Sequence, residues 1–190
     1  MEFSALDNLE LLKEAQKLHE NNEFKKCIEL CIANENFIDE EHKLSFLIIQ
    51  MYCNHYLENH EKTLELTEKI YDIDSLNNDN NWVKIYTLLK LKKYDECITF
   101  LTKMTENSEN SENKGEIYKY IGTCYYNLEN YIQAMDFFSK AIKEGYDDET
   151  LSTMSNMCLL FQLNVLENLD LEIEEENKKE YFEESKENLQ

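Results

Sequence analysis

The sequence predicts an all-α fold in which about four antiparallel helix pairs stack on one another, followed by a C-terminal capping helix. The first observation is a repeated pattern, because four short polar breaks each end in an aromatic residue or a histidine: Phe24, His60, Tyr94 and Tyr131. The second is their spacing of 36, 34 and 37 residues, a period typical of helix–turn–helix repeats. The third is composition, since no proline and only 3 glycines interrupt the 190 residues.

Each break separates two stretches that carry apolar residues at helical spacing. We expect helices over about 4–20 and 23–34, 40–57 and 60–73, 81–91 and 94–106, and 115–128 and 131–144. The pairs then span about 4–34, 40–73, 81–106 and 115–144 within a repeat domain of 1–148. The asparagines of 77–81 supply capping groups for a helix beginning near Trp82. The stretch 106–113 is a polar low-complexity loop, either simply solvated or regulatory.

The fourth pair carries the most specific motif. Its apolar and small positions are Tyr118, Ile121, Gly122, Tyr125, Ala134, Phe138 and Ala141. Gly122 and Ala134 are small where the two helices must cross closely, and the larger side chains fill the space beside the crossing. The pattern resembles the tetratricopeptide repeat (TPR), with Tyr146 standing where that family usually has proline. The other pairs match more weakly, so the resemblance covers about 5–148 and is best over 115–148.

The resemblance implies a right-handed α-α superhelix whose first helices line a concave groove that binds a partner helix or an extended peptide. Carrying the groove positions of the family onto this chain gives a candidate partner-binding set: Lys13, His19, Tyr52, Tyr56, Trp82, Tyr86, Lys90, Lys119, Tyr120 and Tyr126. His55 also occupies a groove position, on the same helix as Tyr52. Tyrosine and tryptophan provide large contact areas at low entropic cost. The alternative is that some of these aromatic residues pack between neighbouring repeats.

A ninth helix is expected over about 149–169, following the acidic start at 147–149. A capping helix should be polar on its outer face, but apolar residues continue around this one. Met157, Leu160 and Phe161 therefore form a candidate second interface. The alternative is that the acidic tail of 170–190, which has helical potential, or a tenth helix covers them.

Charge and composition argue against several classes of protein. A formal net charge of −21, with 19 lysines and no arginine, opposes binding to nucleic acid and to anionic membrane surfaces. The first 30 residues lack the pattern of a secretory signal, and no run is apolar enough to span a bilayer. The scattered cysteines fit reduced, buried thiols in an intracellular protein, with bridged cysteines as the alternative. These features predict a cytoplasmic location and leave the nucleus open.

No residue pattern indicates catalysis. The four histidines lack metal-ligand spacing, and 3 glycines leave little scope for a phosphate-binding loop. Cys27 and Cys31 share a helical face that suits zinc in principle, but both also occupy core positions. We therefore expect no enzyme activity, no cofactor and no metal.

The resulting hypothesis is a non-enzymatic scaffold or adaptor subunit of a multiprotein complex. One alternative is a co-chaperone or import-receptor module that binds C-terminal peptides. Its carboxylate clamp is weakened here, because Leu12 and Gln16 stand where such TPR clamps place lysine and asparagine and the chain has no arginine. The other alternative is a self-associating subunit of a large TPR assembly, such as a ubiquitin-ligase scaffold or the signal recognition particle.

Overall fold

A computed structural model describes residues 8–106, 113–146, 148 and 150–164. These residues form helices joined by short turns and contain no strand, which confirms the predicted all-α fold. The chain forms two compact units, Met1–Cys97 and Ile98–Gln190. The expected acidic tail of 170–190 and most of the expected 106–113 loop lie outside the described residues.

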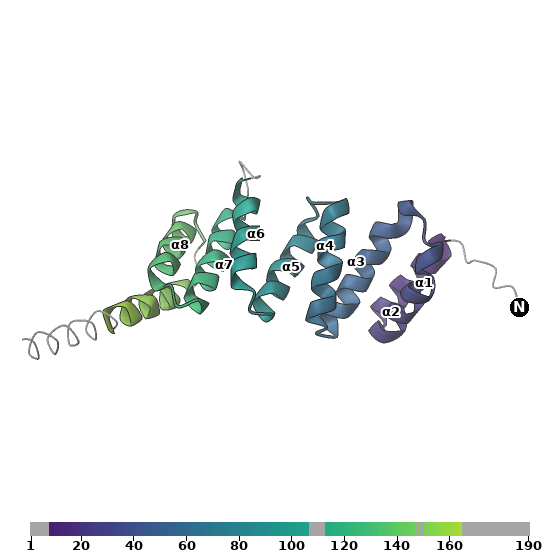
Figure 1. Ribbon diagram of the computed structural model, residues 1–190, viewed down its shortest axis with the longest axis horizontal. Helices are drawn as coiled ribbons and strands as arrows, with labels where there is room; N and C mark the ends of the chain where they lie inside the picture. Colours follow the sequence, from purple (N-terminus) through teal and green to yellow (C-terminus); the bar gives the residue numbers. More distant parts are fainter. Residues whose placement is uncertain (1–7, 107–112, 147, 149, 165–190) are drawn as a thin grey trace, which may run out of the picture. The chain divides into compact units, whose positions relative to one another are not determined.

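The first unit holds α1 (Asn8–Glu20), α2 (Phe24–Ala33), the short 3₁₀ helix η1 (Glu35–Phe37), α3 (Glu40–Tyr56), α4 (His60–Ile73) and α5 (Asn78–Lys90). Helix α1 packs on α2 and α3, α3 also packs on α4, and α4 packs on α5 (Figure 1). Helix α6 (Tyr94–Glu106) begins in this unit and ends in the next.

The second unit contains the remainder of α6, the packed pair α7 (Lys114–Asn127) and α8 (Tyr131–Lys143), and a helix whose described part is 150–164. Most helix ends fall within one or two residues of the expected positions. Helix α5 is an exception, because it begins at Asn78 and not near residue 81. The expected helix start near residue 4 and the expected helix end near residue 169 lie outside the described residues. The Asn77 side chain accepts a hydrogen bond from the Asn80 N–H, so the cap lies at the start of the asparagine run and not at its end.

The four turns within the helix pairs share one backbone geometry. Each places a non-glycine residue in the left-handed region, with φ of 60° at Asn22, 57° at Glu58, 57° at Lys92 and 59° at Glu129. In the second of these turns the Asn59 N–H donates to the Asn54 carbonyl at 2.9 Å and the Glu58 N–H to the His55 carbonyl at 3.0 Å. The same two bonds recur in the other three turns and define a Schellman motif. The repeat seen in the sequence is therefore a repeat of backbone structure.

Replacing Glu129 by glycine is expected to stabilise the protein, because an L-residue in this conformation carries a steric cost that glycine lacks. We expect Glu129→Gly to exceed Glu129→Ala in free energy of unfolding by about 1 kcal/mol, measured by urea denaturation. The alanine variant is the control, since it loses the same charge and keeps Cβ. Equal stability of the two variants would contradict the proposed role of φ at this turn.

The core of the first unit combines apolar side chains with thiols. One cluster contains Leu11, Ala15, Cys27, Cys31, Phe46 and Cys53, and a second contains Met51, Leu66 and Ile70. The Cys27 thiol donates to the Ala15 carbonyl at 3.3 Å. All six cysteines of the chain are buried and free, which confirms the expected buried thiols.

The closest helix crossing in the second unit lies between α7 and α8. A methyl group added at Gly122 would stand 2.5 Å from Cε1 of Phe138 and 3.2 Å from the carbonyl oxygen of Ala134. Phe138 and Ala134 are both fully buried. The prediction that Gly122 and Ala134 are small because the helices cross there is confirmed.

The interface between α4 and α5 is more polar than the sequence suggested. Lys84 is only 7% exposed, and its Nζ lies 2.8 Å from Glu68 Oε1 and 5.0 Å from the centre of the Tyr71 ring. Asn80 is fully buried and donates to the Thr67 carbonyl at 3.1 Å. Polar contacts of this kind are geometrically demanding, so they help to fix how the two helices pack.

Candidate protein-interaction site

Six ring side chains of the first unit form one aromatic cluster. Its members come from the ends of α1 and α3, the start of α2 and the second half of α5: His19, Phe24, Tyr52, His55, Tyr56 and Tyr86. Because α1 and α3 occupy equivalent places in successive repeats and pack on each other, side chains at their C-terminal ends become neighbours.

The rings contact one another closely. Phe24 and Tyr56 stack with centroids 5.0 Å apart and planes inclined by 14°. The His19 ring lies 5.6 Å from Phe24, 6.2 Å from Tyr52 and 5.8 Å from Tyr56. The His55 ring meets Tyr86 edge-on at 5.2 Å. These contacts restrict the rings, and a restricted surface lowers the entropic cost of any binding event.

Two tyrosines carry the exposed part of the cluster. Tyr56 is 57% exposed and Tyr86 is 44% exposed, although both rings are braced by histidines. The Lys90 ammonium lies 5.1 Å from the centre of the Tyr86 ring. The surface therefore offers apolar ring faces with one cation at its edge, a combination that suits polypeptide side chains.

Polar groups in the cluster, and on His60 at the start of α4, are incompletely paired. His19 Nε2, His55 Nδ1 and His60 Nδ1 are buried and have no hydrogen-bond partner within the described part of the chain. Burial, together with the neighbouring His60, lowers the pKa of His55. Burial and the charge of Asp79, which also hydrogen-bonds to Tyr52, raise the pKa of that tyrosine. His55 is therefore favoured in its neutral form, and the Tyr52 hydroxyl keeps its proton at neutral pH.

Among the described residues, no three His, Cys, Asp or Glu side chains are grouped to hold a metal ion. In the core of this unit, hydrogen bonding to the Cys27 sulfur and burial raise the pKa of Cys31 and Cys53. They are therefore favoured in the unreactive thiol form. Within the residues that the structure describes, no helix has the length and apolar character needed to cross a bilayer.

The structure brings His19, Tyr52, Tyr56, Tyr86 and Lys90 of the candidate set together. Lys13 is exposed on α1, in a hollow that Lys17 and Leu18 also line. Trp82 is half-buried on α5. The Asp79 contact with Tyr52 had no signal in the sequence, because it depends on how the start of α5 meets α3.

The candidate residues of the second unit contact the segment that follows α8. Lys119 Nζ lies 2.9 Å from Asp148 Oδ2 and 3.1 Å from the Tyr146 hydroxyl. Burial disfavours the charged lysine, but these two bonds outweigh it and raise the pKa of Lys119. The bond from Lys119, supported by bonds from Thr150, lowers the pKa of Asp148 to about 2. Tyr120 is half-buried, with the Lys119 ammonium 5.8 Å from its ring centre.

The helix of 150–164 packs on α8 through one face. Leu151 and Cys158 are fully buried against Ala134, Phe138 and Ala141. Phe161 stacks on Tyr131 at 5.0 Å and lies 6.5 Å from Tyr126. Of the candidate second interface, Met157 and Phe161 are each 40% exposed and Leu160 is 66% exposed. Leu159 and Leu163 extend the exposed apolar surface.

Comparisons with solved structures identify similar folds. YrrB, described as a TPR protein with an unusual peptide-binding site, is 16% identical, with a TM-score of 0.64 over 83% of this chain and 79% of YrrB. MamA from Desulfovibrio magneticus RS-1 is 14% identical, with a TM-score of 0.63 over 86% of this chain and 96% of MamA. MamA from AMB-1 is 15% identical, with a TM-score of 0.60 over 80% of each chain.

A scan against protein-family models and a search of curated proteins gave no match. The structural likeness agrees with the repeated turns and with the small residues at the α7–α8 crossing. The chain has the tetratricopeptide-repeat fold.

Proposed function

We propose that the protein is a non-enzymatic interaction scaffold, an adaptor subunit of a multiprotein complex that works in the cytoplasm. The observation that carries this proposal is the aromatic cluster, because two braced tyrosine rings stand exposed on it. Its partner is a helix or an extended peptide with apolar side chains. The fold supports the proposal, since YrrB, a protein of similar structure, is described as having a peptide-binding site.

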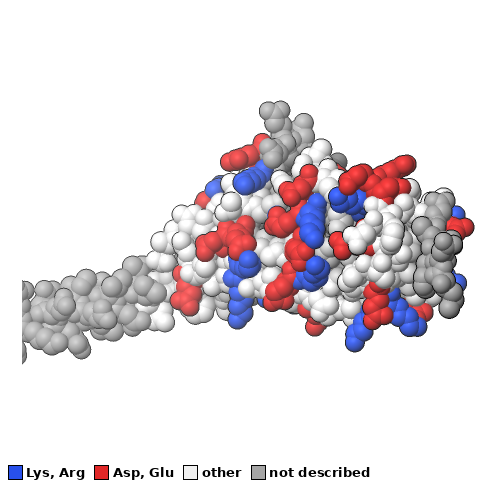
Figure 2. Space-filling model, turned by 45° about the vertical axis from the view of Figure 1, so that its right-hand side comes forward, with Lys and Arg blue, Asp and Glu red and all other residues white. Residues whose placement is uncertain are grey.

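The remaining candidate groove residues are also proposed to contact a partner, Lys13 and Trp82 on the first unit and Lys119, Tyr120 and Tyr126 on the second. The exposed apolar face of 150–164 is a second proposed surface, through Met157, Leu160 and Phe161. Charge supports protein partners over nucleic acid. On the face drawn in Figure 2 the lysines lie among carboxylates and do not form a separate basic patch, whereas phosphate backbones require clustered cations.

Replacing both exposed tyrosines by alanine should strongly weaken partner capture. We expect the double variant Tyr56→Ala, Tyr86→Ala to weaken binding at least ~30-fold, about 2 kcal/mol. Tyrosines that a partner covers are frequent hot spots of interfaces. The measurement is affinity purification from the native cell with quantitative mass spectrometry, followed by titration of the recovered partner.

The control replaces apolar residues with comparable exposure elsewhere, Ile132→Ala with Ile142→Ala on α8. A parallel Leu160→Asp variant separates partners of the second surface from partners of the cluster. Partners that are recovered equally by the tyrosine variant and by the wild type would refute the role of the aromatic cluster.

A further inference from the structure

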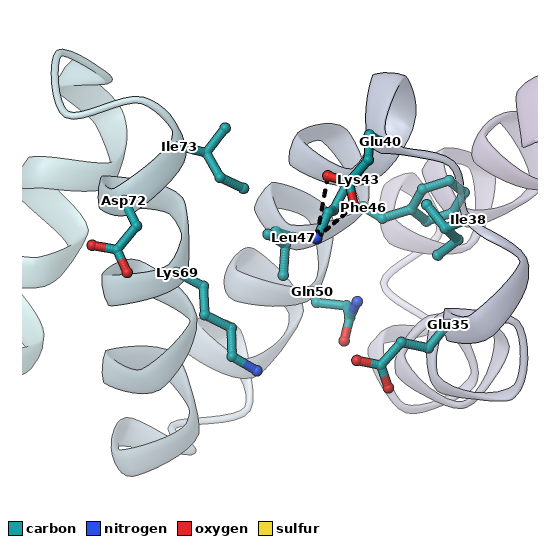
Figure 3. Close-up of a pocket in the computed structure, with 10 residues that line it drawn as sticks. All are labelled: Glu35, Ile38, Glu40, Lys43, Phe46, Leu47, Gln50, Lys69, Asp72 and Ile73. Carbon is teal, nitrogen blue, oxygen red and sulfur yellow. Dashed lines mark hydrogen bonds and ion pairs between the residues drawn. The ribbon is translucent and has the colours of Figure 1, made fainter.

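A second hollow lies in the first unit, away from the aromatic cluster. It has a volume of about 510 Å³ and lies between η1 with the following turn, the first half of α3, and the last turns of α4 (Figure 3). The aromatic cluster uses residues 52–56 of α3, whereas this cleft uses residues 40–50. The volume lies within the range of sites that hold small ligands or a few side chains.

The cleft has an apolar part and a polar part. Ile73 on α4 points across toward Leu47 on α3, and Ile38 and Phe46 lie on the other side of Leu47 (Figure 3). At the other end, the Lys69 ammonium and the Glu35 carboxylate approach from opposite walls, with the Gln50 amide between them (Figure 3). Two neighbours of lining residues in the sequence are also apolar and exposed, since Phe37 is 67% exposed and Leu76 is 86% exposed.

The charges of the cleft leave an excess of carboxylates. Lys43 pairs with Glu40 at 2.9 Å, and Lys69 pairs with Glu65 at 2.8 Å. Both lysines that line the cleft are thus neutralised by their own helices. Glu35 and Asp72 also line it. Glu35 is close enough to Lys69 for its charge to help raise the pKa of that lysine, after the hydrogen bond to Glu65. A ligand meets an apolar wall with the Glu35 carboxylate at the polar end, while the Asp72 carboxylate lies at the rim, on the side of α4 turned away from Leu47 (Figure 3).

This combination selects among ligands. Anionic lipid headgroups and phosphates would be repelled by the surplus carboxylates. The polar end offers an amide, an ammonium and a carboxylate, and together these can serve both the N–H and the C=O groups of a peptide backbone. The apolar end can shelter one large side chain.

We propose that the cleft binds a short segment of a partner polypeptide in which one large apolar side chain is flanked by lysine or arginine. The apolar side chain lies against Leu47 and Ile73. One basic residue faces Glu35 at the polar end, and the other reaches Asp72 at the rim. The site is separate from the aromatic cluster, and the failure of either proposal leaves the other standing.

The test uses the full chain and three synthetic heptapeptides, each titrated at 150 mM salt and followed by ¹H–¹⁵N correlation spectra. The first has a central phenylalanine between lysine pairs, the second replaces its lysines by glutamates, and the third replaces its phenylalanine by alanine. We expect the first to shift signals of residues 35–50 and 69–76, and to bind at least ~10-fold more tightly than either analogue.

Charge reversal supplies the decisive variant. Glu35 and Asp72 are both exposed, so Glu35→Lys with Asp72→Lys should keep the fold. We expect the variant to lose the lysine peptide and to prefer the glutamate peptide. In the wild-type chain, Ile73→Asp should remove binding of the lysine peptide. The control Ile132→Asp changes an exposed isoleucine on α8 and should leave that binding unchanged.

The proposal is overturned if the charge-reversed variant keeps its preference for lysine. It is also overturned if the shifts lie at the aromatic cluster, or if they spread over the acidic surface without a maximum at the cleft.

Discussion

Phe138→Ala is expected to lower the free energy of unfolding by about 3–5 kcal/mol. Phe138 is fully buried and packs with Ala134, Ala141, Leu151 and Cys158, so its loss leaves a cavity where α8 meets both α7 and the helix of 150–164. A loss of this size is a large share of the stability of a typical domain. Urea denaturation followed by circular dichroism gives the measurement.

The contact between Phe138 and Gly122 makes this prediction sharper. Gly122→Ala alone should cost about 1–3 kcal/mol, because the new methyl group would lie 2.5 Å from a ring that cannot move away. In the Phe138→Ala background the ring contact is gone and only the 3.2 Å contact with the Ala134 carbonyl oxygen remains, while alanine is the better helix former by about 1 kcal/mol. The cost of Gly122→Ala should therefore fall well below its value in the wild type. Additive effects in this double-mutant cycle would show that the ring does not set the size limit at position 122.

Much of the fold could be predicted because its information is local and repeated. The anchors Phe24, His60, Tyr94 and Tyr131 each follow a Schellman turn two residues after a left-handed residue, so their spacing reports a backbone motif. Amphipathic spacing then places the helices on both sides of each turn. Only in the fourth pair does the sequence also predict how the two helices pack, because Gly122 and Ala134 are small where the helices cross.

The polar interface between α4 and α5 shows where sequence reasoning stops. Asparagines such as Asn80 are typical of turns and caps, and the sequence alone placed them in a connector before the helix. In the structure Asn77 caps the helix, which draws Asn80 into its first turn and buries it against Thr67. Lys84 is buried only because Glu68 and Tyr71 lie opposite it. Burial of this kind depends on tertiary partners, and no local pattern encodes it.

The candidate site was predictable to a similar degree. Their positions in the repeats predicted that His19, Tyr56 and Tyr86 lie on the C-terminal halves of successive first helices. The structure shows the three residues in one cluster. The order in which the rings touch, and the Asp79 charge beside Tyr52, required the packing of α1, α3 and α5. The cleft at Leu47 and Ile73 had no signal, because its walls come from three segments that share no motif.

Leu151→Ala is expected to release the helix of 150–164 while leaving α7 and α8 folded. Leu151 is fully buried in the cluster that Ala134, Phe138 and Ala141 form, and it is the first large apolar residue of that helix. Shortening a buried leucine costs about 2–5 kcal/mol. Few other buried side chains hold this helix, since Cys158 is the next fully buried residue along it. The loss should therefore appear as local opening.

Hydrogen exchange followed by mass spectrometry measures that opening. A loss of about 2 kcal/mol corresponds to at least ~30-fold faster exchange of the backbone amides in 152–164, while exchange in α7 keeps its wild-type rate. The matched control is Leu160→Ala on the same helix, where the leucine is 66% exposed and the change should shift stability by no more than ~0.5 kcal/mol. If Leu160→Ala opens the helix as much as Leu151→Ala does, the exposed leucine is already buried by a contact, and the face of Met157, Leu160 and Phe161 is not available to a partner. If only Leu151→Ala opens it, one face of the helix holds it to α8 and the other remains available for binding.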